Sequence, residues 1–253
     1  MISSNSLRSI HFRFTEPRFP FPKIFRKMLR RVSIPLQFFF DVFNTVVPFL
    51  DPNRLSELRK ISRMKKMSTI AIGAIINECV REMPRDACYL NIGTWYGYSL
   101  FAGMVGNASR RCIGIDSFEQ FGHPKVECLR RFEELRSDRH EFHVSDWRQY
   151  MAKHASEVGV FFYDADHSED CQYESLLSCH PFIVDGGIVI VDDANWTGPR
   201  RATERFLRLH SEYEVLLDVA TYCNCHPTFW NGLMILRKKP AHVPVHSSHA
   251  YRP

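Results

Sequence analysis

Paired acids follow two apolar runs of the chain: Asp164 and Asp166 stand after the first run, and Asp192 and Asp193 after the second. Carboxylates that converge repel one another, so a group of this kind needs a cation or bound protons. Aspartate oxygens with open positions suit Mg²⁺ or a similar hard cation. His167 stands beside the first pair, and an imidazole can take a proton from a hydroxyl group. The pattern predicts metal-assisted acid–base chemistry, whereas helix caps would explain one acid per run and not two.

A glycine-containing segment, NIGTWYGYS, overlaps the end of another apolar run. Gly93 at a strand end would let the backbone approach a ligand, and Gly97 would open a helix whose N-terminus attracts a carboxylate. The GxxxG spacing differs from the GxGxxG of dinucleotide sites. Asp116 follows the next apolar run, where an acid can accept both hydroxyls of a ribose; a surface aspartate is the alternative. Ser145 and Asp146 end a weaker run and would lie near an adenine amino group.

Apolar runs and helical patterns alternate along the chain and place these motifs at the ends of strands. The expected strands are residues 88–92, 112–115, 141–145, 158–163, 187–191, 214–219 and 232–236. The expected helices between them are residues 98–107, 124–136, 146–154, 169–180 and 199–210. Short apolar strands that alternate with helices are typical of a parallel sheet covered on both faces. We therefore predict an α/β fold: a doubly wound, mainly parallel seven-stranded sheet with an N-terminal helical extension.

The charge of the chain is unevenly distributed. We divide its 253 residues into 1–67, a basic leader and helical extension, 68–240, the ligand-binding domain, and 241–253, a C-terminal tail. Residues 1–31 hold eight Lys or Arg side chains against one acid, which makes +7, so the rest of the chain carries −2 of the total of +5. This argues against nucleic acid as a partner of the domain. The leader also fits peripheral contact with a membrane surface or an organelle transit peptide.

Two further helices are expected before the sheet. Asp51 or Asn53 can cap a helix that reaches about residue 60, and Ser68 can cap another that stops before Pro84. The apolar stretch of residues 34–50 is short for a membrane span, which needs about 20 apolar residues. We interpret it as a helix packed on the domain, with an interfacial membrane helix as the alternative.

Eight cysteines in a chain of this length are too few for a disulfide scaffold. Cys223, Cys225 and His226 could bind a metal, but no second pair stands at zinc-finger spacing. The N-terminus has no short apolar core followed by small residues, so no signal peptide is expected. These features favour a reducing, cytoplasmic location, with membrane-peripheral and organellar locations as alternatives.

Taken in order, the motifs resemble those of the class I S-adenosylmethionine-dependent O-methyltransferases. GTWYGYS is similar to the glycine loop of the catechol and caffeoyl-CoA O-methyltransferases, DADH to their DADK segment and DDANWTG to their DNxxWxG segment. The two acidic segments also resemble those of the macrocin-type sugar O-methyltransferases. The resemblance covers roughly residues 85–237 and not the leader. Asn91 stands where the family usually has Glu or Asp, and an amide would contact the methionine ammonium group with less electrostatic strength.

The resemblance implies S-adenosylmethionine and Mg²⁺ or a similar divalent cation as cofactors, with the metal on Asp164, Asp192 and Asp193. It leaves two residues as the catalytic base: His167 stands where the catechol type has lysine, and Asp166 where the macrocin type has aspartate. The cofactor-binding residues that it implies are Asn91, Gly93, Tyr96, Gly97, Ser99, Asp116, Ser117, Ser145, Asp146 and Asp164.

The expected reaction is methyl transfer to a hydroxyl group of a small molecule or sugar, with a metal on the acceptor oxygen and a base that removes its proton. Acceptor choice is expected from the leader and from residues 118–125 and 196–201, while residues 226–230 would cover the crevice or form a packed aromatic turn. Two alternatives stay open. One is a hydroxylase-like or other metal-dependent enzyme on this fold, and the other is a non-catalytic binding module at a membrane surface. A homo-oligomer is compatible with either.

Overall fold

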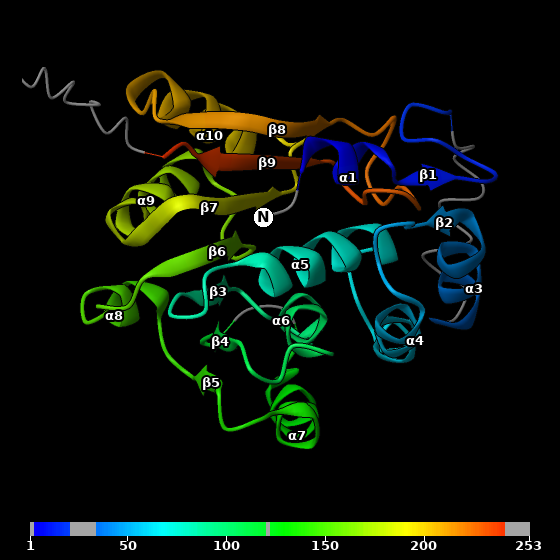
Figure 1. Ribbon diagram of the computed structural model, residues 1–253, viewed down its shortest axis with the longest axis horizontal. Coiled ribbons are helices and arrows are strands. Elements are labelled where there is room, and N and C mark those ends of the chain that lie inside the picture. Colours follow the sequence, from blue (N-terminus) through cyan, green and yellow to red (C-terminus); the bar gives the residue numbers. More distant parts are fainter. Residues whose placement is uncertain (1–2, 21–33, 120–121, 241–253) are drawn as a thin grey trace, which may run out of the picture.

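The computed structural model describes residues 3–20, 34–119 and 122–240, and its centre is a seven-stranded sheet (Figure 1). In spatial order the strands are β5 (His140–His143), β4 (Arg111–Ile115), β3 (Cys88–Ile92), β6 (Val158–Tyr163), β7 (Ile183–Asp192), β9 (Leu233–Lys238) and β8 (Tyr213–Val219). The five strands from β5 to β7 are parallel, and β9 is antiparallel to both of its neighbours. The predicted doubly wound, mainly parallel sheet is confirmed.

The order of the strands reverses between β3 and β6. From β3 the chain proceeds outward to β4 and β5, then crosses back to β6 and continues to β7. Such a reversal opens a crevice beyond the carboxyl ends of the central strands, where ligands bind. The register places Asn91 of β3 beside Gly114 of β4 and Phe162 of β6, so these strands end at one edge. The motifs predicted to do chemistry therefore meet at this edge.

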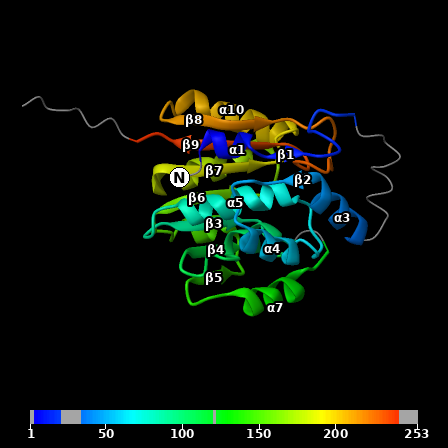
Figure 2. The same ribbon diagram turned by 45° about the vertical axis from the view of Figure 1, so that its right-hand side comes forward.

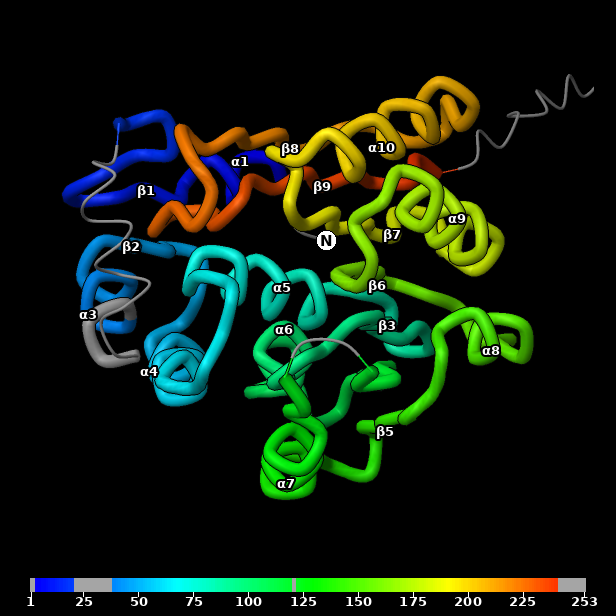
Figure 3. The backbone as a smooth tube through the Cα atoms, turned by 180° about the vertical axis from the view of Figure 1, so that it is seen from behind, coloured from blue at the N-terminus to red at the C-terminus, as the bar shows by residue number. Residues whose placement is uncertain are grey.

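Helices cover both faces of the sheet. Figure 2 shows α5 across one face of the stacked strands, and Figure 3 shows the other face from behind. The first face carries α5 (Ile70–Glu82), α6 (Tyr98–Met104) and α7 (Lys125–Leu135), and the second α8 (Trp147–Met151), α9 (Glu169–Cys179) and α10 (Thr197–Leu209). Because side chains alternate along a strand, Phe161 and Phe162 of β6 enter different hydrophobic cores, one on each face.

The N-terminal segment lies along the sheet and reaches its carboxyl edge, at the right of Figure 1. Its described elements are α1 (Ser4–Arg8), β1 (His11–Phe12), α3 (Ile34–Asn44), β2 (Thr45–Val46) and α4 (Pro52–Ile61). β1 and β2 pair as an antiparallel ribbon. Leu7, Val47 and Leu58 are buried in the core that includes α5 and α6. Residues 21–33 of the predicted leader and the predicted tail, residues 241–253, lie outside the described residues.

Two helix starts differ in how well local sequence predicts them. Asp51 is the N-cap of α4, and its Oδ1 accepts hydrogen bonds from two backbone N–H groups of the first turn at 3.0 Å. The expectation that Ser68 caps α5 is wrong, because Thr69 is the N-cap. The carboxylate of Asp41 also accepts from the N–H of Ile70 at 2.9 Å. This contact from a distant segment favours a helix start one residue later than expected.

Residues 34–44 of the apolar stretch form α3, which is packed on the domain as expected. The side-chain oxygen of Asn44, its last residue, accepts from the backbone N–H groups of Phe14 and Thr15, at 2.9 and 3.1 Å. Among the described residues, none of the helices is both long and apolar enough to span a membrane. All eight cysteines are described, and none of them forms a disulfide.

Candidate active site

A cavity of about 810 Å³ lies beyond the carboxyl ends of β3, β4, β6 and β7. Ligand pockets for small molecules occupy about 300–1,000 Å³, so the cavity has a suitable size. Residues 65–69 of the N-terminal segment form part of its wall. Most of the predicted site residues line it: Gly93, Tyr96, Ser99, Asp116, Ser117, Ser145, Asp146, Asp164, Asp166, His167, Asp192 and Asp193. Asn91 and Gly97 are buried beside it.

The loop after β3 needs glycine for two reasons. Gly93 and Gly97 have φ angles of +81° and +97°, a conformation that residues with a Cβ rarely adopt. A Cβ on Gly93 would also lie 2.1 Å from the backbone oxygen of Asp164. The loops after β3 and β6 therefore touch at this point, and a side chain here would push Asp164 away. Close backbone approach at Gly93 serves the protein itself as well as a ligand.

The carboxylate of Asp116 holds the glycine loop in place. Its Oδ2 accepts from the backbone N–H groups of Thr94 at 2.8 Å and Trp95 at 2.7 Å, and its Oδ1 accepts from Phe118 at 2.7 Å. Trp95 and Phe118 have positive φ angles of 50° and 57°, and charge-assisted hydrogen bonds offset the strain of that conformation. Oδ2 also accepts from the Oγ1 of Thr94 at 3.3 Å, so its lone pairs are occupied, whereas Oδ1 retains one. Because Asp116 lines the cavity, Oδ1 can also accept a ribose hydroxyl.

Asn91 and Ser99 are linked beside the cavity. The Oγ of Ser99 donates to Oδ1 of Asn91 at 3.0 Å, and both side chains are buried. Within the described part of the chain, Nδ2 of Asn91 has no hydrogen-bond partner. Because a buried donor without a partner is unfavourable, this amide fits a polar ligand group nearby.

Lys65 places a cation at the aromatic wall of the cavity. Its Nζ lies 5.3 Å from the centre of the Trp95 ring and 4.8 Å from that of Tyr96, within the range of a cation–π contact. Tyr96 is one of the predicted cofactor residues, and Lys65 was not predicted. This wall combines flat rings with a positive charge, so it suits a ligand that is both planar and polar.

Three other predicted cofactor residues follow β4 and β5. Asp146 is the N-cap of α8, and its Oδ1 accepts from the N–H groups of Arg148 and Gln149 at 2.9 and 3.3 Å. Ser117 and Ser145 are half-buried on the cavity wall. Asp146 therefore has a structural role that needs no ligand, while its place on the cavity is compatible with the predicted contact to adenine.

Asp164, His167 and Asp193 converge in the cavity. Nε2 of His167 lies 3.2 Å from Oδ2 of Asp193 and 3.6 Å from Oδ1 of Asp164. One donor atom from each residue lies within 4.8 Å of the other two, which is close enough for the three to hold a metal ion. Asp192 is not in this group, and its Oδ1 accepts from the backbone N–H of Asp193 at 2.9 Å. The structure thus combines two of the three predicted metal ligands with His167, one of the two predicted bases.

The surroundings of Asp164, Asp192 and Asp193 disfavour the negative charge of their carboxyl groups. Burial raises the pKa of Asp164, Asp192 and Asp193, and the charges of neighbouring aspartates raise the pKa of the first two further. His167 opposes this effect at Asp193. Carboxylates this close need protons or a cation between them. Either a protonated imidazole or a divalent metal ion can provide the positive charge.

Asp166 is engaged in the turn that begins α9. Its Oδ1 accepts from the backbone N–H of Ser168 at 2.7 Å, and hydrogen bonds from Ser168 lower the pKa of this exposed carboxyl. A carboxylate with a lowered pKa is a weak proton acceptor at neutral pH. Of the two predicted bases, His167 therefore has the better environment.

Asn231 lines the cavity and contacts the acidic cluster, and sequence reasoning missed it. Its Nδ2 donates to Oδ1 of Asp193 at 2.6 Å, and the side chain is buried. Trp196 packs edge-on against the ring of His167, with 4.9 Å between the ring centres. Asn231 lies in the loop before β9, 38 residues from Asp193, and the Asn-Gly pair at 231–232 indicates only a turn.

A buried ion pair in the wall formed by the N-terminal segment was also missed. Nζ of Lys66 lies 2.8 Å from Oδ2 of Asp41, and both side chains are 3% exposed. Burial raises the pKa of Asp41, while the nearby Lys66 opposes that shift. Both residues line the cavity. The signal that could have found the pair is Asp41 itself, an isolated acid inside an apolar stretch.

Residues 90–194 match a family model described as a methyltransferase domain. The matched residues include the glycine loop, Asp116 and both pairs of acids. The match confirms the predicted resemblance to the S-adenosylmethionine-dependent methyltransferases over this part of the chain. No curated protein matches the chain.

Solved structures with the same fold include an O-methyltransferase from Bacillus cereus in complex with SAH, at 16% identity and a TM-score of 0.54, with 76% of this chain and 94% of that chain covered. Another is TomG, an O-methyltransferase from Streptomyces achromogenes involved in tomaymycin synthesis and solved with SAM. It has 15% identity and a TM-score of 0.56, and the match covers 81% of this chain and 96% of TomG. Cofactor-bound Rv0187 from MTB has 16% identity and a TM-score of 0.53, with 87% and 98% covered. At these identities the likeness shows the fold.

Proposed function

We propose that the chain transfers the methyl group of S-adenosylmethionine to a hydroxyl oxygen of a small molecule or sugar. The observation that carries the proposal is that two sets of groups face one cavity: the glycine loop with Asp116, and His167 flanked by Asp164 and Asp193. The domain match supports the cofactor. Two of the solved structures with this fold are described as O-methyltransferases, which supports oxygen as the acceptor atom.

The cavity fits the parts of the cofactor. Oδ1 of Asp116 can accept a ribose hydroxyl, and the unpartnered NH₂ group of Asn91 fits an acceptor group of the methionine part. Ser145 and Asp146 lie on the wall where we place adenine. When bound, S-adenosylmethionine supplies a methyl group on a positively charged sulfur, and a divalent cation would lower the pKa of the acceptor hydroxyl.

His167 serves as the base in this proposal. The proton of the acceptor hydroxyl goes to Nε2, where Asp193 and Asp164, at 3.2 and 3.6 Å, stabilise the imidazolium that forms. Asn231 holds Asp193 from its other oxygen and is a positioning residue.

We further propose that Mg²⁺ or a similar divalent cation binds between Asp164 and Asp193. Carboxylate oxygens are ligands for hard cations, so we assign the metal to the two aspartates and the proton to His167. Asp192, the third predicted ligand, lies beside them; its Oδ1 accepts from the backbone N–H of Asp193, so its other oxygen would be the one to join. Because a carboxylate binds a metal in its deprotonated form, the raised pKa of all three carboxyls makes protons compete with the metal.

Isothermal titration calorimetry with S-adenosylmethionine, with and without Mg²⁺, tests the cofactor and the metal separately. We expect S-adenosylmethionine to bind in both conditions, and Mg²⁺ to bind the cofactor complex of the wild type but not that of Asp193→Asn. Glu119→Gln, which removes one negative charge from an exposed residue on the same cavity, is the matched control and should bind both. If S-adenosylmethionine does not bind in either condition, the proposed function is wrong. If S-adenosylmethionine binds but the titration with Mg²⁺ gives no heat of binding, only the proposed metal site is wrong.

A panel of phenols and sugars, analysed by mass spectrometry for methylated products, tests the acceptor class. With an acceptor that the wild type methylates, His167→Ala should bind S-adenosylmethionine normally and form product far more slowly, because general-base catalysis contributes about 10²–10⁴-fold. Asp166→Asn should remain close to the wild-type rate. The opposite ranking of the two variants would identify Asp166 as the base.

A further inference from the structure

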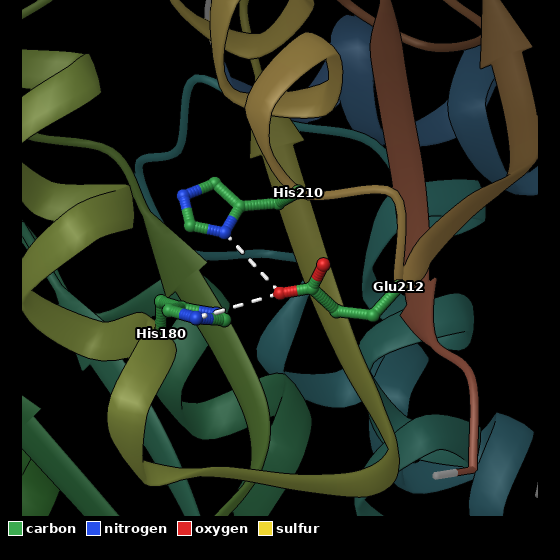
Figure 4. A group of neighbouring side chains, drawn as sticks. All are labelled: His180, His210 and Glu212. Carbon is green, nitrogen blue, oxygen red and sulfur yellow. Dashed lines mark hydrogen bonds and ion pairs between the residues drawn. The ribbon is translucent and has the colours of Figure 1, made fainter. Parts of the chain in front are cut away.

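A second group of metal-binding side chains lies away from the cavity. Figure 4 shows His180, His210 and Glu212 pointing toward one another from three different elements. His180 begins the short 3-10 helix that follows α9, His210 directly follows α10, and Glu212 directly precedes β8. These positions precede β7 and β8, so the group lies toward the amino ends of those strands. None of the three residues lines the catalytic cavity.

The distances in this group are those of metal ligands that share one ion. Nδ1 of His210 lies 3.2 Å from Oε1 of Glu212, and Nε2 of His180 lies 3.5 Å from the same oxygen. A tetrahedral zinc site with bonds of about 2.0–2.2 Å places its ligand atoms about 3.3–3.5 Å apart. One donor atom from each residue lies within 4.8 Å of the other two. A small movement of the imidazoles would therefore place all three donors around one ion.

Tyr213 orients one of the imidazoles. Its hydroxyl oxygen lies 3.1 Å from Nδ1 of His180 and can accept a hydrogen bond from Nδ1–H. In that tautomer the lone pair of Nε2 faces Glu212. Metal-binding histidines commonly use their other ring nitrogen in this way, which sets the tautomer and the ring direction. Phe206 stacks on the ring of His210, with 4.3 Å between the ring centres. Neighbouring side chains thus hold both rings in place.

The group can be reached from solvent, and the pKa of one of its two imidazoles is lowered. The side chains of His180, His210 and Glu212 are 23%, 19% and 39% exposed, so an ion can enter. Burial, together with the charges of His210 and Lys238, lowers the pKa of His180. A neutral imidazole is the form that binds a metal ion.

We propose that His180, His210 and Glu212 form a binding site for a divalent transition metal ion of the zinc type, separate from the catalytic cavity. Two imidazoles and one carboxylate suit Zn²⁺, Ni²⁺ or Cu²⁺ better than Mg²⁺, which prefers oxygen ligands alone. The ion would join the end of α9, the end of α10 and the start of β8. Its binding energy would then stabilise the contact between these three elements.

Titration of the full-length protein with Zn²⁺ against a chromophoric chelator tests this site. The cysteines and the cluster of Asp164, His167 and Asp193 are other places where zinc can bind, so the decisive quantity is the difference between variants. We expect the wild type to bind one equivalent more than His180→Ala or His210→Ala. His143→Ala removes a partly exposed histidine that also lies near a glutamate, at 3.4 Å from Glu141, and should bind as the wild type does.

A conservative variant guards against a loss of binding through misfolding. Tyr213→Phe keeps the packing and removes only the hydroxyl that orients His180, so we expect it to retain the equivalent with an affinity about 10–100-fold weaker. Co²⁺ provides a second measurement, because imidazole and carboxylate ligands give a d–d spectrum without the charge-transfer band of thiolates. The proposal is overturned if the wild type and both histidine variants, folded by circular dichroism, bind equal amounts of zinc, or if Tyr213→Phe binds it as tightly as the wild type.

Discussion

Replacing Asp116 by asparagine removes a charge and leaves one acceptor oxygen where the carboxylate has two. The two oxygens accept from the backbone N–H groups of Thr94, Trp95 and Phe118 at 2.7–2.8 Å. An asparagine oxygen can serve either Thr94 and Trp95 or Phe118, and its NH₂ group then faces a donor on the other side. At least one hydrogen bond to a charged group is lost, which is worth about 1.5–3 kcal/mol. We expect the free energy of unfolding without cofactor to fall by about 2 kcal/mol.

The proposed ribose contact adds a separate loss to Asp116→Asn. Weakening the hydrogen bond to the ribose by about 2 kcal/mol corresponds to an affinity for S-adenosylmethionine about 30-fold lower. Urea unfolding without cofactor measures the first effect, and calorimetry measures the second, with Glu119→Gln as the charge-matched control on the same cavity. An Asp116→Asn protein that is as stable and binds as tightly as the wild type would refute the reasoning. A lower free energy of unfolding with an unchanged affinity for S-adenosylmethionine would mean that Asp116 only stabilises the glycine loop.

We expect Gly93→Ala to lose S-adenosylmethionine binding because its Cβ would meet a backbone oxygen at 2.1 Å. Gly122→Ala, at a φ of +80° with nothing within 4 Å, should cost only about 1–2 kcal/mol; equal urea unfolding and cofactor binding of the two variants would contradict the contact at Gly93. Lys66→Met leaves Asp41 buried without its partner and should lower the free energy of unfolding by about 3–5 kcal/mol. Adding Asp41→Asn should restore part of that stability in denaturant unfolding, and no recovery would count against the ion pair. Burial raises the pKa of the three cavity carboxyls, so the folded protein binds more protons than the unfolded chain, and their contribution to stability falls as the pH rises above about 4. Thermal unfolding without added metal should therefore decline less steeply with pH in Asp193→Asn than in the wild type, and an equal or steeper decline would be the contrary result.

The fold could be predicted from local sequence because each element leaves a local signal. A strand buried on both faces must be a run of apolar residues, and a helix between two strands shows its own period and its caps. The predicted strand of residues 187–191 is longer in the structure, where β7 begins at Ile183. Its first residues include Asp185, which is exposed. Because they do not form an apolar run, the sequence does not predict them as part of the strand.

The sequence alone therefore determined the sheet, the edge at which a ligand binds and the acids at that edge, since parallel strands end together wherever the rest of the chain lies. It could not determine which side chains meet there. His167 lies between Asp164 and Asp193, and Asn231 contacts Asp193 from another loop. These contacts depend on how loops from distant parts of the chain close over the edge, and residue spacing within a motif carries no information about that.

The same limit explains the two groups that were found only in three dimensions. Asp41 and Lys66 are 25 residues apart, and they form a buried pair because α3 and the segment before α5 pack against the same wall. His180 and Glu212 lie on opposite sides of β7 and α10 in the chain and meet because the ends of two helices and the start of β8 lie side by side. Local periodicity encodes which elements form, whereas the meeting of side chains is decided by the packing of those elements against one another.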